Sequence, residues 1–140
     1  NAHLHEFVIN GTTYSDPDNP PHGKFVSERG TKTKLKFLNL QTGDKFMYTY
    51  DFGDDWTHEV LIEEIHEPVP KKTYPKCIAG ERACPPENGG PPGYEHILHV
   101  LRNAGGSEYK DLVQWLGGDF DPERFDAAAY RWLPIMLTYS

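Results

Sequence analysis

One stretch decides the fold, and it reads Tyr48-Thr49-Tyr50-Asp51-Phe52-Gly53-Asp54-Asp55-Trp56-Thr57-His58-Glu59-Val60. Aromatic and polar residues alternate on both sides of a Gly-Asp-Asp step. Alternation with a period of two is typical of a strand with one buried face, and a short loop containing Gly is typical of a hairpin. The stretch therefore predicts two antiparallel strands, from Lys45 to Phe52 and from Trp56 to Ile65. It puts one set of aromatic side chains on the core face: Phe46, Tyr48, Tyr50 and Phe52.

Further strand patterns precede this hairpin. The run from His3 to Ile9 alternates, so that His3, His5, Phe7 and Ile9 share a face. Asn10-Gly11 follows, which is a strong signal for a two-residue hairpin turn into the next short strand. The run from Lys34 to Leu40 predicts another strand, while residues 15–33 predict loops. The first half of the chain therefore predicts an antiparallel meander.

The second half predicts a long loop and then three helices. Residues 67–93 contain seven prolines and four glycines, which favours an ordered loop. Three runs with apolar residues at helical spacing follow, separated by Gly105-Gly106 and Gly117-Gly118. Ser107 is the expected cap of the second helix, and Asp121-Pro122 the expected start of the third. Their apolar stripes are Tyr94, Ile97, Leu98 and Leu101; Tyr109, Leu112, Val113 and Leu116; and Phe125, Ala128, Ala129 and Trp132.

Strands first and helices last predict an α+β fold, with three helices packed on the sheet. At 140 residues we expect a single domain, residues 1–140. The net charge of −7 argues against nonspecific nucleic-acid binding, which relies on Lys and Arg. No apolar run approaches the ~20 residues that span a bilayer, and no signal segment is recognisable. We therefore expect a cytoplasmic protein that binds neither nucleic acid nor membrane.

The acidic hairpin is the first candidate site. Asp51, Asp54, Asp55 and His58 lie close together in sequence, and the loop is expected to present Asp54 and Asp55 to solvent. Carboxylates with an imidazole suit a divalent metal ion or acid–base chemistry. The structural alternative is that Asp and Gly are simply good turn residues. Trp56 is either a core residue or, if it is exposed, a binding residue.

Two further groups have the composition of metal ligands. His3 and His5 leave one strand face together, and His58 joins them if the faces match; otherwise they are polar residues near a strand end. Cys77 and Cys84, with His96 and His99 on the following helix, have the donor types of a structural zinc site. The spacing between the two cysteines is longer than in usual zinc knuckles, so a disulfide and two free, packed thiols are the alternatives.

Five motifs in order resemble those of the plasmid pRiA4b ORF-3-like family of bacterial and archaeal proteins. They are His3-Leu4-His5-Glu6-Phe7, the stretch from Tyr50 to His58, Cys84-Pro85-Pro86-Glu87, Gly89-Gly90-Pro91-Pro92-Gly93-Tyr94 and the stretch from Trp115 to Pro122. The resemblance implies a compact α+β domain and supplies no mechanism. Members usually carry a Pro-x-Ile-Trp-Arg-Arg-like strand and a helix before the first motif, so this chain is expected to lack the family's first elements. Members often have an Asp and another residue, sometimes a second Cys, between the Glu and the Gly-Gly pair of these motifs. This chain has only Asn88 between Glu87 and Gly89, which argues against a shared cysteine-rich metal site.

Two functions remain open. Some family members are labelled as passengers of mobile elements or as resolvase-like, but this chain has no catalytic Ser in a recombinase context and no basic DNA-reading helix. It also lacks nucleophile-elbow, phosphate-loop and zincin motifs. The first hypothesis is a non-enzymatic interaction or accessory domain that binds a protein partner or a small ligand near the Asp-rich hairpin. The second is a metal-dependent hydrolase that uses His3, His5, Asp51, Asp54, Asp55 and His58.

Overall fold

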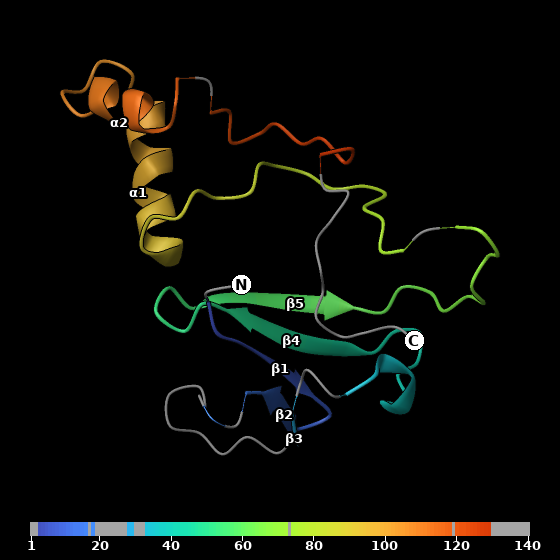
Figure 1. The fold of residues 1–140 in the computed structure, drawn as a ribbon. Coiled ribbons are helices and arrows are strands. Elements are labelled where there is room, and N and C mark those ends of the chain that lie inside the picture. The colour runs from blue at the N-terminus through green and yellow to red at the C-terminus, as the bar shows by residue number, and fades with distance from the viewer. Residues whose placement is uncertain are drawn as a thin grey trace. The chain divides into compact units, whose positions relative to one another are not determined.

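The structure is a computed structural model that describes residues 3–16, 18, 28–29, 33–72, 74–118 and 120–129. The described residues fall into two compact units, one up to Tyr74 and one from Pro75 onward. The first unit is built on a β-sheet and the second on two helices (Figure 1). The expectation of a single domain stays a prediction.

The sheet unit has the predicted antiparallel architecture. Its strands are β1 (His5–Ile9), β2 (Thr12–Ser15), β3 (Glu28–Arg29), β4 (Lys45–Tyr50) and β5 (Trp56–Leu61). They lie in the order β3-β2-β1-β4-β5, and every neighbouring pair is antiparallel except β2 with β3 (Figure 1). The unit is therefore a four-stranded antiparallel sheet with the two-residue β3 at one edge and β5 at the other. The predicted meander is wrong, because β4 pairs with β1, the first strand of the chain, instead of with the segment that precedes it.

The Asn10-Gly11 hairpin is confirmed. Ile9 pairs with Thr12, so only Asn10 and Gly11 form the turn. Their φ angles are 50° and 75°. Two successive positive φ angles define the type I′ turn, whose twist matches that of the flanking strands. This turn fixes the register between β1 and β2.

The second hairpin is confirmed with different boundaries. β4 ends at Tyr50, two residues before the predicted Phe52, and β5 ends at Leu61 instead of Ile65. Residues 51–55 form the loop, which is longer than the three residues predicted. The reason is that Asp51 and Asp55 both have φ 57°, a left-handed conformation that cannot continue a strand.

The predicted strand from Lys34 to Leu40 is wrong. Residues Leu35–Phe37 form a short 3₁₀ helix, in which the Phe37 and Leu38 amides donate to the carbonyls three residues earlier. This turn brings Leu35 and Leu38, together with Leu40, against the core of the sheet. Because Leu35 and Leu38 are three residues apart, one helical turn brings both to the same side, which a strand would not do.

The core of the sheet unit lies on one face. Phe7, Ile9 and Phe46 are 5%, 2% and 7% exposed. Tyr14, Tyr48, Val60 and Ile62 pack against them, with the three leucines of segment 35–40. Of the predicted aromatic face, Phe46 is buried, while Tyr48, Tyr50 and Phe52 are only half-buried. The core is therefore complete at one end of the face and open at the other.

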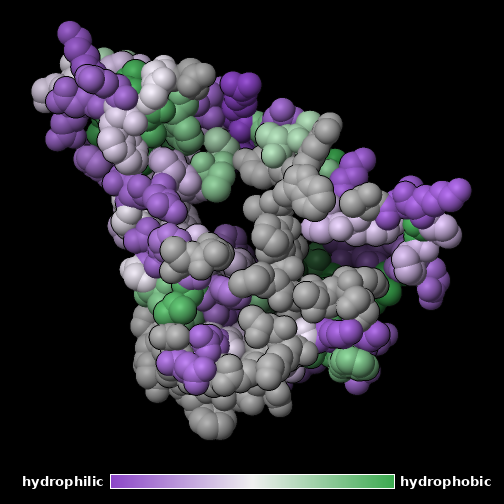
Figure 2. Space-filling model, in the orientation of Figure 1, coloured by the Kyte–Doolittle hydropathy of each residue, from purple (hydrophilic) through white to green (hydrophobic). Residues whose placement is uncertain are grey.

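The second unit contains α1 (Gly90–Arg102) and α2 (Tyr109–Trp115). Pro91 and Pro92 occupy the first turn of α1, where their missing amide donors cost nothing. A Cβ on Gly93 would overlap the Asn88 carbonyl oxygen, so the last glycine of the Gly-Gly-Pro-Pro-Gly motif has a steric role. Ile97 of the predicted stripe is buried, and so is Val100, which the predicted stripe did not include. Tyr94, Leu98 and Leu101 are half-buried. Figure 2 shows mainly hydrophilic residues over the visible side of these helices. Within the described ranges, no helix is both long and apolar enough to cross a bilayer.

Two helix predictions need correction. Glu108, not Ser107, precedes the first helical residue of α2, and no side chain caps this end. The third helix is not formed in the described part, residues 120–129. Instead the carboxylates of Asp121 and Asp126 accept hydrogen bonds from the amides of Glu123 and Ala128, two residues further on. These local turns compete with a helix for the same backbone donors. Trp132 lies outside the described residues, and the packing of helices on the sheet stays a prediction.

Candidate functional site

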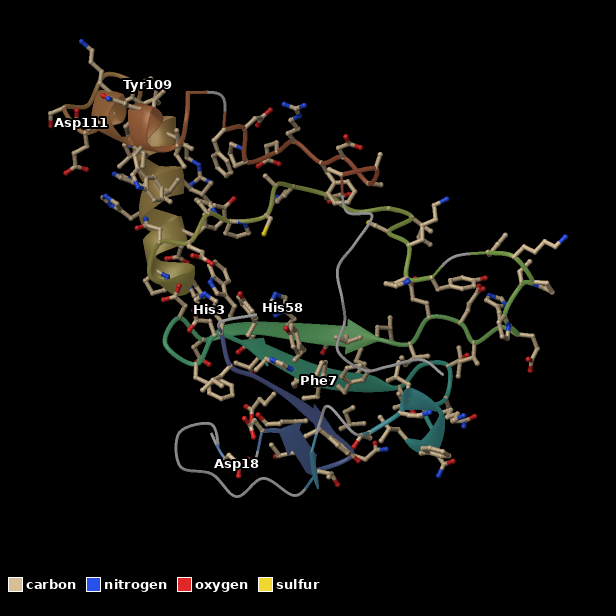
Figure 3. The ribbon with its side chains drawn as sticks, in the orientation of Figure 1. His3, Phe7, Asp18, His58, Tyr109 and Asp111 are labelled. Carbon is tan, nitrogen blue, oxygen red and sulfur yellow. The ribbon has the colours of Figure 1, made fainter. Side chains whose placement is uncertain are left out.

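The open end of the core face carries most of the predicted site residues. His5 pairs with Tyr50, and Tyr50 pairs with Trp56, so these three form one row across β1, β4 and β5. In the next row, Phe7 pairs with Tyr48, which pairs with His58. Residues directly opposite in neighbouring strands project from the same face. We call this region the histidine–aromatic surface; it consists of His3, His5, Tyr48, Tyr50, Trp56 and His58. Figure 3 labels His3 and His58.

Ring contacts connect the histidine–aromatic surface to the core. The rings of His3 and Tyr50 have centroids 5.5 Å apart, and those of Tyr48 and His58 are 5.4 Å apart. His5 contacts the same Tyr48 ring at 6.2 Å. Tyr48 in turn stacks on the buried Phe7 ring at 4.7 Å. The surface is therefore a continuation of the core in which imidazole and phenol rings replace aliphatic side chains.

The side chains of the histidine–aromatic surface differ in their exposure to solvent. His58 is exposed, and His3, His5, Tyr50 and Trp56 are half-buried. The Nδ1 atom of His58 lies 3.3 Å from the Tyr48 carbonyl oxygen, which orients the ring against the strand. Burial raises the pKa of the Tyr48 hydroxyl, and the neighbouring Tyr50 adds to the effect. Tyr48 is therefore a neutral hydrogen-bonding group at physiological pH.

Asp51 holds His3 in position. Its Oδ2 lies 2.5 Å from His3 Nδ1. Its Oδ1 accepts hydrogen bonds from the Gly53 amide at 2.9 Å and the Asp54 amide at 3.4 Å. The Asp51 amide donates to the Leu4 carbonyl at 2.9 Å, next to His3 in the chain. Asp51 thus shapes the loop between β4 and β5 and holds the His3 imidazole in position.

The charge of Asp51 is stabilised by these contacts. The Gly53 amide is the largest cause that holds the pKa of the Asp51 carboxyl below its ordinary value, with smaller effects from the Asp54 amide and His3. Partial desolvation acts in the opposite direction and does not outweigh them. An ionised carboxylate on Nδ1 favours the tautomer in which Nδ1 carries the proton.

Asp54 and Asp55 serve the turn. Asp55 is exposed and Asp54 half-buried, so the expectation of two solvent-facing carboxylates holds fully only for Asp55. The amides of both residues donate to the Asp51 carbonyl, at 3.1 and 2.6 Å. This geometry supports the structural interpretation of the Asp-Asp pair.

The four residues of the predicted zinc site have separate partners. Cys77 and Cys84 are free thiols, and each points its sulfur at a nearby backbone carbonyl oxygen. His96 lies 3.6 Å from a Glu108 carboxylate oxygen, and His99 contacts the Asn103 side chain. No disulfide joins the cysteines in this structure.

Neither predicted ligand group is assembled as a metal centre. Across the described residues, no three His, Cys, Asp or Glu side chains lie close enough together to hold an ion. His3 and Asp51 are in contact, whereas His5 and His58 each approach Tyr48 instead. Metal binding by these residues remains a prediction. Of the proposed ligands, His3 and Asp51 are the pair that the structure brings into contact.

A small hollow lies elsewhere, in the helical unit. Its volume is about 150 Å³, and its lining includes His99, Asn103, Glu108 and Tyr109 at the facing ends of α1 and α2. This volume is well below the ~300–1,000 Å³ typical of small-molecule sites. No sequence motif pointed to it.

Sequence reasoning missed a buried polar row on the other face of the sheet. Glu6 and Thr49 pair across β1 and β4 and are 6% and 7% exposed, and Ser15 on β2 is 5% exposed. Among the described residues, Glu6 Oε2 is a buried side-chain oxygen without a hydrogen-bond partner. Alternation places Glu6 on the face opposite Phe7, but that pattern alone indicates exposure, not burial. The sequence carried no signal for this row.

Comparison with known proteins agrees with the motifs. The family model described as "Plasmid pRiA4b ORF-3-like protein" matches residues 1–129. The uncharacterized protein y4hQ of Sinorhizobium fredii (strain NBRC 101917 / NGR234) is 32% identical over 124 residues, which are 86% of this chain and 62% of y4hQ. The crystal structure of the protein of unknown function MM3350 from Methanosarcina mazei Go1 is 38% identical, with a TM-score of 0.76. That match covers 94% of this chain and 75% of the MM3350 chain.

This chain thus spans 62% of the length of y4hQ. The match of the family model extends over most of the 140 residues and includes all five motifs. The chain belongs to the plasmid pRiA4b ORF-3-like family.

Proposed function

We propose that this chain is a non-enzymatic interaction domain and that a partner protein binds its histidine–aromatic surface. One observation carries the proposal. At one end of the core face, aromatic and imidazole rings continue the packed core but remain half-buried or exposed. Aromatic residues are enriched in protein–protein interfaces and dominate their binding energy. A partner that covers this end would complete the burial that begins at Phe7.

The composition of the surface suits a protein better than a small molecule. Tyr48, Tyr50 and Trp56 supply apolar area, and each also carries a polar group. The hollow of about 150 Å³ lies in the helical unit, whereas the histidine–aromatic surface lies on the sheet. Small-molecule sites are concave and enclose most of their ligand.

The surface is also held in a defined shape. Asp51 fixes the His3 ring, and the backbone amides of the loop fix Asp51. Tyr48 is stacked on Phe7 and therefore has little freedom. A pre-organised surface loses less conformational entropy when a partner binds.

A capture experiment with matched variants tests this function. The chain would be immobilised and exposed to a lysate of its source cells, beside a Trp56→Ala/His58→Ala variant and a Thr42→Ala control in an exposed turn. We expect a specific protein to be retained by the wild type and by Thr42→Ala, and lost with the double variant. Because Trp56 is half-buried, we expect Trp56→Ala to cost less than the ~3–5 kcal/mol of a fully buried large aromatic. Equal retention by all three proteins, with folded variants by circular dichroism, would rule out this surface.

One observation favours the second candidate, a metal-dependent hydrolase. A carboxylate on Nδ1 of an imidazole, as in Asp51–His3, is the arrangement that orients histidines which bind metal or act as a base through Nε2. Its test is elemental analysis of protein purified without a histidine tag, with melting curves before and after chelation. Stoichiometric metal and a lower melting temperature after chelation would support a hydrolase; absence of both would eliminate it.

A further inference from the structure

β5 forms an edge of the sheet, and its pairing shows which backbone groups face outward. The Ile62 amide donates to the Asp44 carbonyl at 2.9 Å, just beyond the end of the β4–β5 ladder. In an antiparallel pair, hydrogen-bonded residues alternate with residues whose amide and carbonyl point away. Counting back from Ile62, Val60, His58 and Trp56 bond to β4. Thr57, Glu59 and Leu61 therefore point their backbone groups away from the sheet.

The hydrogen bonds between β4 and β1 lead to the same assignment of the outward residues of β5. The Asp51 amide donates to the Leu4 carbonyl at 2.9 Å, toward β1. Counting back by two, Thr49 and Met47 also bond toward β1. Tyr48 and Tyr50 must then bond toward β5, where their partners are His58 and Trp56. Two independent hydrogen bonds thus agree on the outward residues.

Within the described residues, the exposed charge of Glu59 is the main feature of the outward edge of β5 that usually protects an edge strand. Among the described strands, β4 is the only neighbour of β5. The strand is six residues long and contains no Pro and no Lys. The side chains of Thr57, Glu59 and Leu61 are all exposed. At the opposite edge, β3 has only two residues, and short edge strands resist further pairing.

We propose that β5 accepts an extended strand of the partner protein, which adds to the sheet in antiparallel orientation. The inference rests on the proposed function and specifies how the partner binds. Strand addition gains affinity from main-chain hydrogen bonds and specificity from alternate side chains. The added strand would lie beside Trp56, His58 and Val60, so it would extend the histidine–aromatic surface by one strand.

The pairing also defines the chemistry of the partner strand. Its residues on the side of Trp56, His58 and Val60 continue an aromatic and apolar row, so they are aromatic or β-branched. Its residues opposite Thr57, Glu59 and Leu61 are polar or basic. Oε1 of Glu59 accepts a hydrogen bond from Lys45 Nζ at 2.7 Å, and a basic residue of the added strand would bind the other carboxylate oxygen. A second copy of β5 fits less well, since the two-fold register centred on Glu59 puts two Glu59 carboxylates directly opposite each other.

A pair of modified peptides tests strand addition. The probe is a ten-residue capped peptide that alternates Val or Tyr with Thr or Lys, and its affinity would be measured by fluorescence anisotropy. In antiparallel addition the Thr and Lys amides face β5, so N-methylation of these residues removes the hydrogen bonds and should weaken binding by about tenfold or more. N-methylation of the Val and Tyr residues should leave the affinity unchanged. Equal binding of both methylated peptides, or no binding of the unmodified peptide at about 1 mM, overturns strand addition.

A protein variant supplies the reciprocal test. Glu59→Pro removes an outward amide without removing a bond to β4, so the sheet should persist while peptide binding is lost. Glu59→Ala is the control for the side chain, and both variants are checked by circular dichroism. If Glu59→Pro does not fold, the two methylated peptides still decide the question with the wild type. Should strand addition fail while the Trp56→Ala/His58→Ala variant still loses its partner, the proposed function stands and only this mode of binding is excluded.

Discussion

Asp51 is the residue on which the hairpin and the site both depend. It combines a left-handed backbone with a carboxylate that accepts two amides and contacts His3. An aspartate tolerates this conformation better than most residues because its short polar side chain bonds locally. The same contacts lower the pKa of its carboxyl in the folded state.

The lowered pKa of the Asp51 carboxyl predicts that the stability of the fold depends on pH. Because the folded pKa lies below the ordinary value of 3.8, the unfolded chain binds more protons in this range, and stability falls as the pH drops. The contribution is fully present above the unfolded pKa and is lost as the pH falls through the folded pKa. We expect Asp51→Asn to melt at a lower temperature than the wild type near pH 7, and the difference to shrink below about pH 4.

Asp55→Asn is the matched control for this titration. Asp55 has the same φ of 57°, but within the described structure its carboxylate accepts no hydrogen bond. Its melting temperature should therefore follow that of the wild type as the pH changes. A constant difference between wild type and Asp51→Asn at every pH would show that the charge of Asp51 is not stabilising.

Substitution of Glu6 is expected to have the opposite effect on stability. A buried side-chain oxygen without a hydrogen-bond partner costs folding free energy, because it has lost its bond to water. Glu6→Met replaces the carboxyl with an apolar group of similar length, so we expect it to raise the free energy of unfolding by about 1 kcal/mol, measured by urea denaturation. Glu59→Met, at an exposed position of the same sheet, should not raise it. A destabilised Glu6→Met variant would mean that the carboxyl has a favourable partner in solution.

At the scale of elements, the first hairpin depends on its turn. Gly11 has φ 75°, and a Cβ there would have nothing within 4 Å, so its substitution has only a conformational cost. We expect Gly11→Ala to destabilise the chain by about 1–2 kcal/mol in urea denaturation. Gly105→Ala is the control, because that position has the same open space without a positive φ. Equal effects of the two substitutions would contradict the type I′ turn.

The elements also show how far sequence reasoning reaches. Both hairpins were predictable because the turn residues and the alternation lie next to each other in the chain. The segment around Leu35 was not, since Lys34 to Leu40 fits strand alternation and also places Leu35 and Leu38 three residues apart. Only the contact of these leucines with the core decides between the two. The third helix failed because Asp121 and Asp126 bond to local amides instead.

The site was predictable to a similar extent. Alternation put His5 with Phe7, and Tyr48 with Tyr50, on one face, as the structure confirms. The contact between His3 and Asp51 follows from the left-handed φ of Asp51, which no sequence pattern indicates. The burial of Glu6 depends on contacts far apart in sequence, which alternation does not report.

At the scale of the whole molecule, the two units differ in their cores. In the described part of the helical unit, the buried hydrophobic side chains are Ile97 and Val100. Small domains with so little buried apolar area are not stable alone. We expect a fragment of residues 75–133 to be unfolded by circular dichroism, while the intact chain melts in one transition. A folded fragment with its own cooperative melting would contradict the prediction of a single domain.

The β4–β5 hairpin is proposed to present a recognition surface with an open strand edge. Amide hydrogen exchange of Thr57, Glu59 and Leu61, measured by NMR with and without the alternating Val/Tyr–Thr/Lys peptide, tests it most directly. We expect these three amides to exchange fast in the free protein and to become protected with the peptide, while the Val60 amide is protected in both states. Slow exchange of Thr57, Glu59 and Leu61 in the free protein, or no change when the peptide is added, would contradict the claim.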